Sequence, residues 1–254
     1  MPFQKVQPEK LSTSVVRQIE LLILRGILRP GERLPPEREL SERLGVSRPS
    51  LRDAVAALQA QGLLSARAGS GVFVADVLGS AFSPALIRLF AAHDEALFDA
   101  LAFRRDMEGL AAMRAARLGS KADLQVIDAT FRRMETGQGG PEAEAELDAR
   151  FHMAIVEASH NVVMLHMMRA MYDLLRQGVF YNRQVMFRQR TTRAALLDQH
   201  RAINDALQAR DPEAARAAVE AHLGYVEQAL TDRRKAERNE RIACQRLEHE
   251  RSRG

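Results

Sequence analysis

Residues 35–74, PPERELSERLGVSRPSLRDAVAALQAQGLLSARAGSGVFV, decide the fold of the N-terminal part of the chain. They predict a helix, a tight turn, a second helix and a short two-stranded wing. Pro36 suits a first helical position, and Gly45 can take the left-handed conformation that ends this helix. Ser47 then offers a hydroxyl cap to the next helix, which has Pro49 in its first turn. The stretch therefore predicts a winged helix-turn-helix.

The second helix of this stretch has one apolar face and one polar face. Its apolar positions are spaced i, i+4 and i+7, at Leu51, Val55 and Leu58. Near its start the opposite face carries arginine and hydroxyl groups, at Arg48, Ser50 and Arg52. This arrangement is typical of a recognition helix that enters the major groove of DNA. The glycine-rich tip of the wing, residues 68–71, allows close backbone approach to a phosphate.

Three linked motifs in this region resemble the winged helix-turn-helix of GntR-family bacterial transcription regulators. They are LPPEREL at 34–40, VSRPSLR at 46–52 and GSGVFV at 69–74. The resemblance implies that the partner is double-stranded operator DNA. The residues expected to contact it are Arg38, Ser47, Arg48, Ser50, Arg52, Gly69, Ser70 and Gly71. The alternative is that the three arginines only form a solvated face.

Composition and charge place limits on the class of protein. The chain has 254 residues, of which 46% are hydrophobic and 28% charged, as in a globular protein. Its single cysteine, Cys244, excludes an internal disulfide framework and favours a reducing, cytoplasmic location. Because no apolar run approaches about 20 residues, we expect no membrane-spanning helix. Residues 1–75 carry 11 basic and 7 acidic side chains, whereas residues 76–231 carry 18 and 21. This asymmetry favours a DNA-binding head on a body of another kind.

The chain divides into four predicted parts. Residues 1–75 form the winged helix-turn-helix, 76–83 a linker, 84–232 an all-α domain and 233–254 a charged tail. Almost every segment of the third part has helical periodicity, which predicts a bundle of six or seven helices and a mainly α protein. The expected helices are 84–92, 94–118, 121–135, 142–158, 162–187, 191–209 and 213–233. The tail has few apolar residues and is expected to be either a helical extension or disordered.

One carboxylate and three imidazoles in the all-α part form a candidate metal site. Asp148 and His152 are spaced i, i+4, so they share a helical face. His200 and His222 lie on two later helices. These four groups could converge on a divalent cation, with zinc favoured by the ligand chemistry and nickel or manganese also compatible. The spacing alone is weak, because i, i+4 Asp–His pairs also occur as ordinary surface contacts.

The all-α part resembles the FCD effector domain of the FadR branch of GntR regulators. That domain has an Asp-x3-His motif followed by two later helical histidines, which Asp148, His152, His200 and His222 match. The stretch AIVEASHNVV at 154–163 is similar too. The resemblance implies a homodimeric repressor that binds a small carboxylate at the metal. Arg104 matches an arginine near the pocket of such domains, and Asn204 follows His200 by one turn, so both are candidate effector contacts.

The resemblance points to more than one effector and leaves other functions open. The N-terminal part looks most like the pyruvate-responsive regulators, and the ligand set looks like the lactate-responsive ones. A 2-oxo or 2-hydroxy acid such as pyruvate or lactate satisfies both, with glycolate or a sugar acid as alternatives. Arg104 could instead form a surface salt bridge with Glu108. The metal-free alternative is a polar pocket that holds its acid directly. We also weigh a metal-dependent enzyme and an architectural DNA-binding protein, although the chain offers no motif for a dedicated general base.

Overall fold

The computed structural model describes residues 10–76, 84–137, 140–176 and 190–253. The chain separates into two compact units, residues 1–81 and 82–254. Most of the expected linker, residues 77–83, lies outside the described residues, as do residues 177–187 of the helix expected at 162–187. Each unit is described by itself below.

The first unit has the expected helix-turn-helix and wing. Its helices are α1 (Leu11–Leu24), α2 (Glu37–Leu44) and α3 (Arg48–Ala60). Its strands β1 (Leu64–Arg67) and β2 (Gly71–Val74) pair antiparallel, with Leu64 opposite Val74 and Arg67 opposite Gly71. The buried core is apolar, formed by Val15, Ile19, Ile23, Leu34, Leu51, Ala54, Leu58, Leu64 and Val74.

The turn between α2 and α3 follows the expected chemistry. Gly45 has φ +66°, a left-handed conformation that costs glycine little. The Ser47 hydroxyl accepts a hydrogen bond from the Ser50 backbone N–H at 3.3 Å and so caps α3. Pro36 precedes α2 as its N-cap and is not its first helical residue, a shift of one position from the prediction. A bridge between Arg33 and Phe73 extends the wing beyond the expected two strands.

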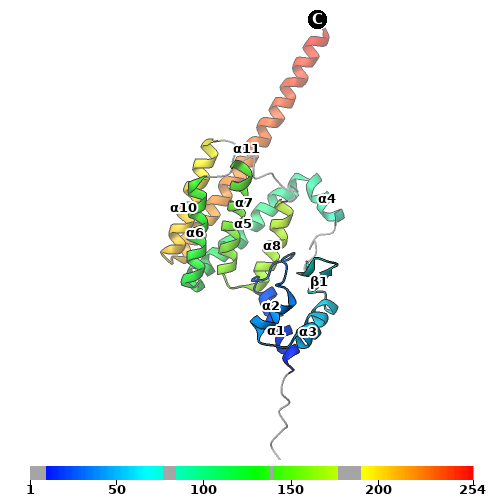
Figure 1. The fold of residues 1–254 in the computed structure, drawn as a ribbon. Coiled ribbons are helices and arrows are strands. Elements are labelled where there is room, and N and C mark those ends of the chain that lie inside the picture. The colour runs from blue at the N-terminus through cyan, green and yellow to red at the C-terminus, as the bar shows by residue number, and fades with distance from the viewer. Residues whose placement is uncertain (1–9, 77–83, 138–139, 177–189, 254) are drawn as a thin grey trace, which may run out of the picture. The chain divides into compact units, whose positions relative to one another are not determined.

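The second unit is a helical bundle, and its described part contains seven helices (Figure 1). They are α4 (Pro84–Ala92), α5 (Asp94–Leu118), α6 (Lys121–Thr136), α7 (Gly140–Ala158), α8 (Val162–Arg176), α10 (Arg190–Gln208) and α11 (Pro212–Arg253). Helix α5 packs on α7 and α11, and α10 packs on α6 and α11. Their inward faces form one apolar core that includes Phe131, Phe151, Met168 and Leu207. α5, α7, α10 and α11 meet around the candidate metal ligands.

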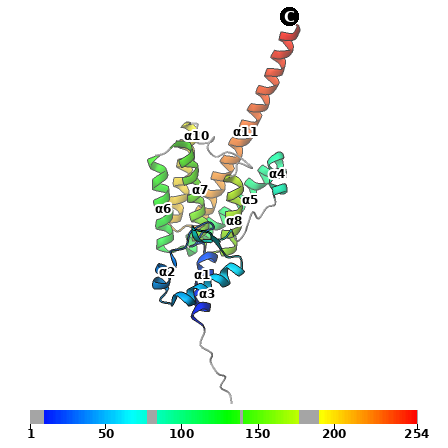
Figure 2. The same cartoon turned by 45° about the vertical axis from the view of Figure 1, so that its right-hand side comes forward.

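Helix α11 differs from the expectation at its C-terminal end. Asp211 caps its start by accepting a hydrogen bond from the Ala214 backbone N–H at 3.0 Å. The helix then continues without a break at 232–233 as far as Arg253. Its last turns project beyond the other described helices of this unit in both views (Figures 1 and 2). Of the two alternatives for the tail, the helical extension is therefore correct for residues 233–253.

The described helices include no membrane-spanning candidate, since each is too short or too polar to cross a bilayer.

Candidate metal centre and DNA-contact surface

Four buried side chains from three helices converge in the second unit. Asp148 and His152 project from α7, His200 from α10 and His222 from α11. Their potential ligand atoms all lie within 4.8 Å of one another. All four residues are at most 5% exposed, which is rare for ionisable groups unless they are paired or bind a metal. The structure thus brings together the whole predicted ligand set.

The distances inside this cluster suit a small cation. His200 Nε2 lies 3.1 Å from Asp148 Oδ1 and 3.3 Å from His152 Nε2. The His152 Nε2 to Asp148 Oδ1 distance is 3.7 Å. Two ligand atoms bound to one tetrahedral zinc at about 2.0–2.1 Å are separated by about 3.3 Å. The three distances lie close to that value, so the residues present fit a divalent ion.

Neighbouring side chains fix the outward nitrogens of two of these rings. His152 Nδ1 lies 2.7 Å from Glu108 Oε2, and His222 Nδ1 lies 3.0 Å from Gln199 Oε1. A carboxylate or amide oxygen can only accept from an imidazole N–H, so a proton on Nδ1 is the form of each ring that suits these contacts. Each ring then keeps a lone pair on Nε2. Outer partners of this kind orient histidine ligands in metal sites.

The protonation state of the cluster also favours a metal over a proton. Burial holds the pKa of His200 below its ordinary value, although Asp148 acts in the opposite direction. Burial lowers the pKa of His222 well below its ordinary value, and His200 and His152 lower it further. These rings are therefore neutral at pH 7, which is the form that binds metal ions.

Arg104 is placed behind the ligands, in the core of the unit. It forms an i, i+4 ion pair with Glu108 at 2.8 Å, as one alternative from the sequence expected. The pair is not on the surface, however, because the two side chains are only 1% and 2% exposed. Arg104 Nη2 also donates to the Tyr172 hydroxyl at 3.2 Å, and that hydroxyl donates to Glu108 Oε1 at 2.9 Å. Burial alone would raise the pKa of Glu108, but Arg104 and His152 outweigh it and keep the carboxylate charged.

Asn204 is buried but its amide is directed to other partners. Its Nδ2 donates to Asp128 Oδ1 at 3.0 Å, and its Oδ1 accepts from Gln208 Nε2 at 3.3 Å. Asp128 belongs to α6, which packs against this part of α10. These bonds hold Asn204 against α6, so its predicted contact with an effector remains a prediction.

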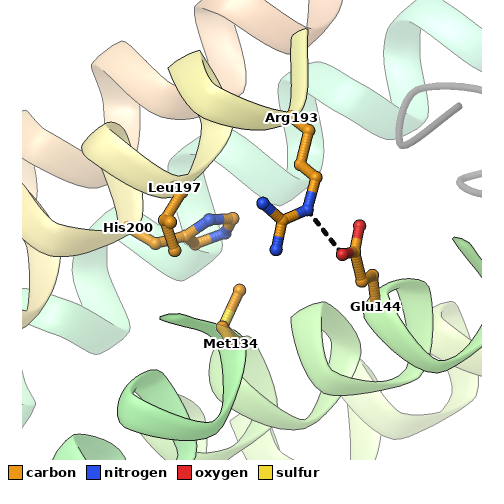
Figure 3. A pocket seen from close by; sticks show the side chains of 5 residues that line it. All are labelled: Met134, Glu144, Arg193, Leu197 and His200. Carbon is orange, nitrogen blue, oxygen red and sulfur yellow. Dashed lines mark hydrogen bonds and ion pairs between the residues drawn. The ribbon is translucent and has the colours of Figure 1, made fainter. Parts of the chain in front are cut away.

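A cavity in the second unit reaches His200 (Figure 3). It is lined by Met134, Glu144, Arg193, Leu197 and His200. It is small, with about 20 Å³ that a water-sized molecule can occupy, and it opens to solvent. The Arg193 guanidinium forms an ion pair with Glu144 across this cavity (Figure 3). His200, one ligand of the candidate metal centre, thus lines this cavity, although its own side chain is fully buried.

In the first unit, the recognition-helix arginines are exposed and share one carboxylate. The side chains of Arg48 and Arg52 are 56% and 63% exposed. Arg48 Nε donates to Glu37 Oε1 at 2.7 Å, and Arg52 Nε donates to Glu37 Oε2 at 2.9 Å. The hydrogen bonds from Arg52 and Arg48 hold the pKa of Glu37 below its ordinary value. A single acidic side chain of α2 therefore aligns two cations of α3.

The other predicted DNA contacts lie on the surface of the same unit. Ser47 and Ser50 are at the start of α3, with their hydroxyl oxygens 2.9 Å apart. Arg38 is exposed on α2, and Gly69, Ser70 and Gly71 are exposed at the wing tip. Gly71 has φ +107°, and a Cβ at this position would lie 3.0 Å from Arg33 Nε. Glycine is therefore favoured there by its conformation, and the Arg33 side chain packs closely against it.

Comparison with known proteins agrees with both units. Residues 11–74 match the family model "Bacterial regulatory proteins, gntR family", and residues 99–225 match the FCD domain. The "Putative L-lactate dehydrogenase operon regulatory protein" of Escherichia coli (strain K12) is 37% identical over 225 residues, which is 87% of this chain and 86% of that protein. The chain belongs to the GntR family. It is a GntR regulator of the FadR branch, with an FCD domain at its C-terminal end.

Two further relatives are similar over most of their length. The "Glc operon transcriptional activator" of Escherichia coli (strain K12) is 33% identical over 86% of this chain and 88% of that protein. The "HTH-type transcriptional regulator LutR" of Bacillus subtilis (strain 168) is 30% identical over 83% of this chain and 96% of that protein. These relatives are transcription regulators and not enzymes, so the family assignment excludes the enzyme alternative.

Four residues near the two sites of this GntR regulator were not predicted to belong to them. Glu37 was not predicted to contact the recognition helix, and Glu108 was expected only to pair with Arg104. Gln199 and Arg193 were not singled out. Gln199 precedes a ligand, and Arg193 lies seven residues before the same ligand on the same helical face. That spacing was the signal in the sequence that could have identified Arg193, because side chains at i and i+7 point in similar directions from a helix.

Proposed function

We propose that this GntR regulator controls genes for the metabolism of a small 2-hydroxy or 2-oxo acid and that its FCD domain binds that acid at a divalent metal ion. Asp148, His152, His200 and His222 would hold the ion, with zinc favoured and nickel or manganese compatible. The observation that carries the proposal is the convergence of these four buried side chains in the effector domain of a DNA-binding family. The relative named for an L-lactate dehydrogenase operon supports the acid class.

The residues around the ligands would each have a distinct task. A divalent ion at this position would supply coordination positions for the oxygen atoms of a small acid. His152 and His222 would present Nε2, because Glu108 and Gln199 hold the protons on Nδ1. Asp148 would supply the negative charge that favours a cation over a neutral ligand. Arg104 and Asn204 remain candidate effector contacts from the sequence.

For DNA, we propose a homodimeric repressor acting in the cytoplasm. Arg48 and Arg52, with Arg38 from the preceding helix, would contact bases and nearby phosphates. Two heads related by a two-fold axis would read two half-sites. The acid would release the operator through unequal affinity for two arrangements of the FCD domain. One relative is named as an activator, so the assay below measures the sign of the response directly.

The metal is tested by elemental analysis of protein purified without added metal, beside a His200→Ala variant. We expect about one divalent ion per chain in the wild type and a loss of most of it in the variant. His166→Ala is the control, because this half-buried histidine lies on α8 outside the ligand cluster. Full metal content in His200→Ala would remove His200 from the site.

The effector is tested by titration of acids into metal-loaded protein on an operator selected from a random duplex library. Pyruvate, lactate and glycolate can chelate through the carboxylate and the adjacent oxygen, whereas acetate cannot. We expect a change in operator affinity with the first three and little change with acetate. Equal responses to acetate and lactate would exclude chelation, and responses that survive a chelator would exclude the metal. Light scattering of the free protein tests the dimer.

A further inference from the structure

The cavity at His200 has an arginine–glutamate ion pair in its lining. Arg193 lies on α10 with Leu197 and His200 at i, i+4 and i+7, so the three share one helical face. Glu144 lies on α7 four residues before Asp148, which is itself four residues before His152. The Arg193–Glu144 pair therefore lies about two helical turns from His200 on one side and one turn from Asp148 on the other. Figure 3 shows both charged side chains directed into the cavity that ends on His200.

This pair differs in burial from the other arginine near the ligands. Arg104 and Glu108 are almost fully buried, and Glu108 contacts His152 at Nδ1, the side of the ring away from the other ligands. In contrast, the Arg193 side chain is 31% exposed and that of Glu144 is 11% exposed. An ion pair with access to water can exchange one of its partners at low cost, whereas a buried pair cannot. Of Arg104 and Arg193, only Arg193 is thus exposed enough for an incoming anion to reach.

The surroundings of Arg193 also hold it over the cavity. Gly137, with φ +60°, ends α6, and a Cβ there would collide with the Arg193 guanidinium. The guanidinium therefore packs against the carbonyl end of α6, where the helix dipole favours a cation. Met134 and Leu197 add apolar side chains to the cavity wall. The cavity as a whole offers one planar cation, a short apolar wall and one imidazole.

We propose that Arg193 is the residue that recognises the carboxylate of the effector, and that Glu144 occupies the guanidinium until the effector carboxylate displaces it. The proposal rests on the function proposed above, since it concerns the same ligand and the same cavity. A guanidinium matches a carboxylate because it donates two parallel hydrogen bonds. The ligand class is a short monocarboxylate, which would enter as Glu144 moves away and would place its remaining atoms between Met134 and Leu197. Glu144 is then a competitor of the ligand and not a contact to it.

The test compares two variants that should act in opposite directions. The dissociation constant of L-lactate is measured by calorimetry on full-length, zinc-loaded protein, with Arg193→Gln and Glu144→Gln beside the wild type. Arg193→Gln should weaken binding about tenfold or more, because it removes a charge-assisted hydrogen-bonding partner. Glu144→Gln should strengthen binding by up to about fivefold, the range expected when a partly exposed ion pair no longer competes. Lactamide, which keeps the chelating oxygens without the charge, should bind wild type much more weakly than lactate.

Three controls keep the interpretation specific. Metal content and melting temperature are measured for each variant, and both should remain close to those of the wild type. Arg201→Gln is the matched control, because Arg201 lies on the same helix and pairs with Asp198 and Glu135 away from the cavity lining. This variant should bind lactate as the wild type does.

The outcomes separate this proposal from the proposed function. If wild-type protein binds none of lactate, pyruvate and glycolate, the effector assignment fails, and with it the role of Arg193. If wild type binds lactate and Arg193→Gln binds it equally well, only the role of Arg193 is refuted. Equal weakening by Arg193→Gln and Glu144→Gln would show a structural ion pair and would also refute it. Equal affinity of the wild type for lactamide and lactate would also refute the role of Arg193.

Discussion

Replacing Glu108 by glutamine should reduce both the stability of the FCD domain and its affinity for metal. The Glu108 carboxylate meets three groups: Arg104 Nε and the Tyr172 hydroxyl at Oε1, and His152 Nδ1 at Oε2. Glutamine has the same shape but only one accepting oxygen, and its NH₂ group can only donate. If this NH₂ faces Arg104 and Tyr172, a buried cation loses its counter-charge. If it faces His152, the proton moves to Nε2 and the ring loses its ligand lone pair.

Both effects have magnitudes that can be measured separately. Removing one partner of a buried ion pair typically costs about 3–5 kcal/mol. For a domain of this size, each kcal/mol shifts the melting temperature by about 2–4 °C, so we expect a decrease of roughly 6–20 °C. Loss of a carboxylate that orients a histidine ligand typically weakens metal binding by about 10–100-fold. Scanning calorimetry of metal-free protein gives the first quantity, and zinc titration against a chelating indicator gives the second.

A double variant separates charge balance from ligand orientation. Glu108→Gln combined with Arg104→Met removes both buried charges, so it should be more stable than Glu108→Gln alone. It still lacks the carboxylate at His152, so its zinc affinity should remain low. Two results would contradict the reasoning: a melting temperature within 2 °C of wild type for Glu108→Gln, or a zinc affinity restored in the double variant.

Three further predictions concern other parts of the chain. Glu37→Gln should lower the ratio of operator affinity to random-duplex affinity about tenfold, because this carboxylate aligns two recognition-helix arginines. Fluorescence anisotropy with both duplexes measures this ratio, and an unchanged ratio would refute the alignment. Asp123→Asn should cost about 1 kcal/mol at pH 7 by disrupting the Ser120 capping box. Ser120 and His160 outweigh burial and hold the pKa of Asp123 below its ordinary value, so its contribution is lost as pH falls through the folded pKa. Melting curves of wild type and variant should therefore converge at low pH, and a constant difference would refute this. Deleting residues 236–254 should leave the melting temperature within about 1 °C, because those of them that the structure describes are exposed, and a larger decrease would show that they pack in solution.

Local sequence features sufficed for much of the fold and for part of the site. Ser47 and Asp211 mark helix starts in the sequence because each caps a backbone N–H only three residues away. Asp148 and His152 share a face for the same local reason. That His200 and His222 join them depends on how α7, α10 and α11 pack, which no spacing within one helix contains. The family resemblance supplied this information.

Burial was the property that the sequence could not give. The i, i+4 spacing predicted the Arg104–Glu108 pair, but its location was wrong when it was taken as a surface bridge. Helix α5 is covered by α7 and α11, so even its charged positions can face protein. The partners of Asn204 were unpredictable for the same reason, because they depend on α6, which packs on the side of α10 where the Asn204 amide lies. The pairing of Glu37 with α3 crosses two helices and depends on the angle between them.

Burial also decides what each arginine–glutamate pair in this regulator can do. In water, an anion exchanges with a carboxylate on a guanidinium at little cost, since neither charge is stranded during the exchange. Arg48 and Arg52 are in that position, so Glu37 can hold them ready and yield to the negative potential of DNA. Arg104 and Glu108 are at the other limit, because separating them would strand two charges in the core, so this pair stays together and supports His152. The Arg193–Glu144 pair is partly buried and lies between these limits. Enough water is excluded for its hydrogen bonds to discriminate a carboxylate from a neutral amide, and enough solvent access remains for an anion to enter. A ligand-responsive site needs an arginine of this intermediate kind, and among the arginines that the structure places near His200, Arg193 has it.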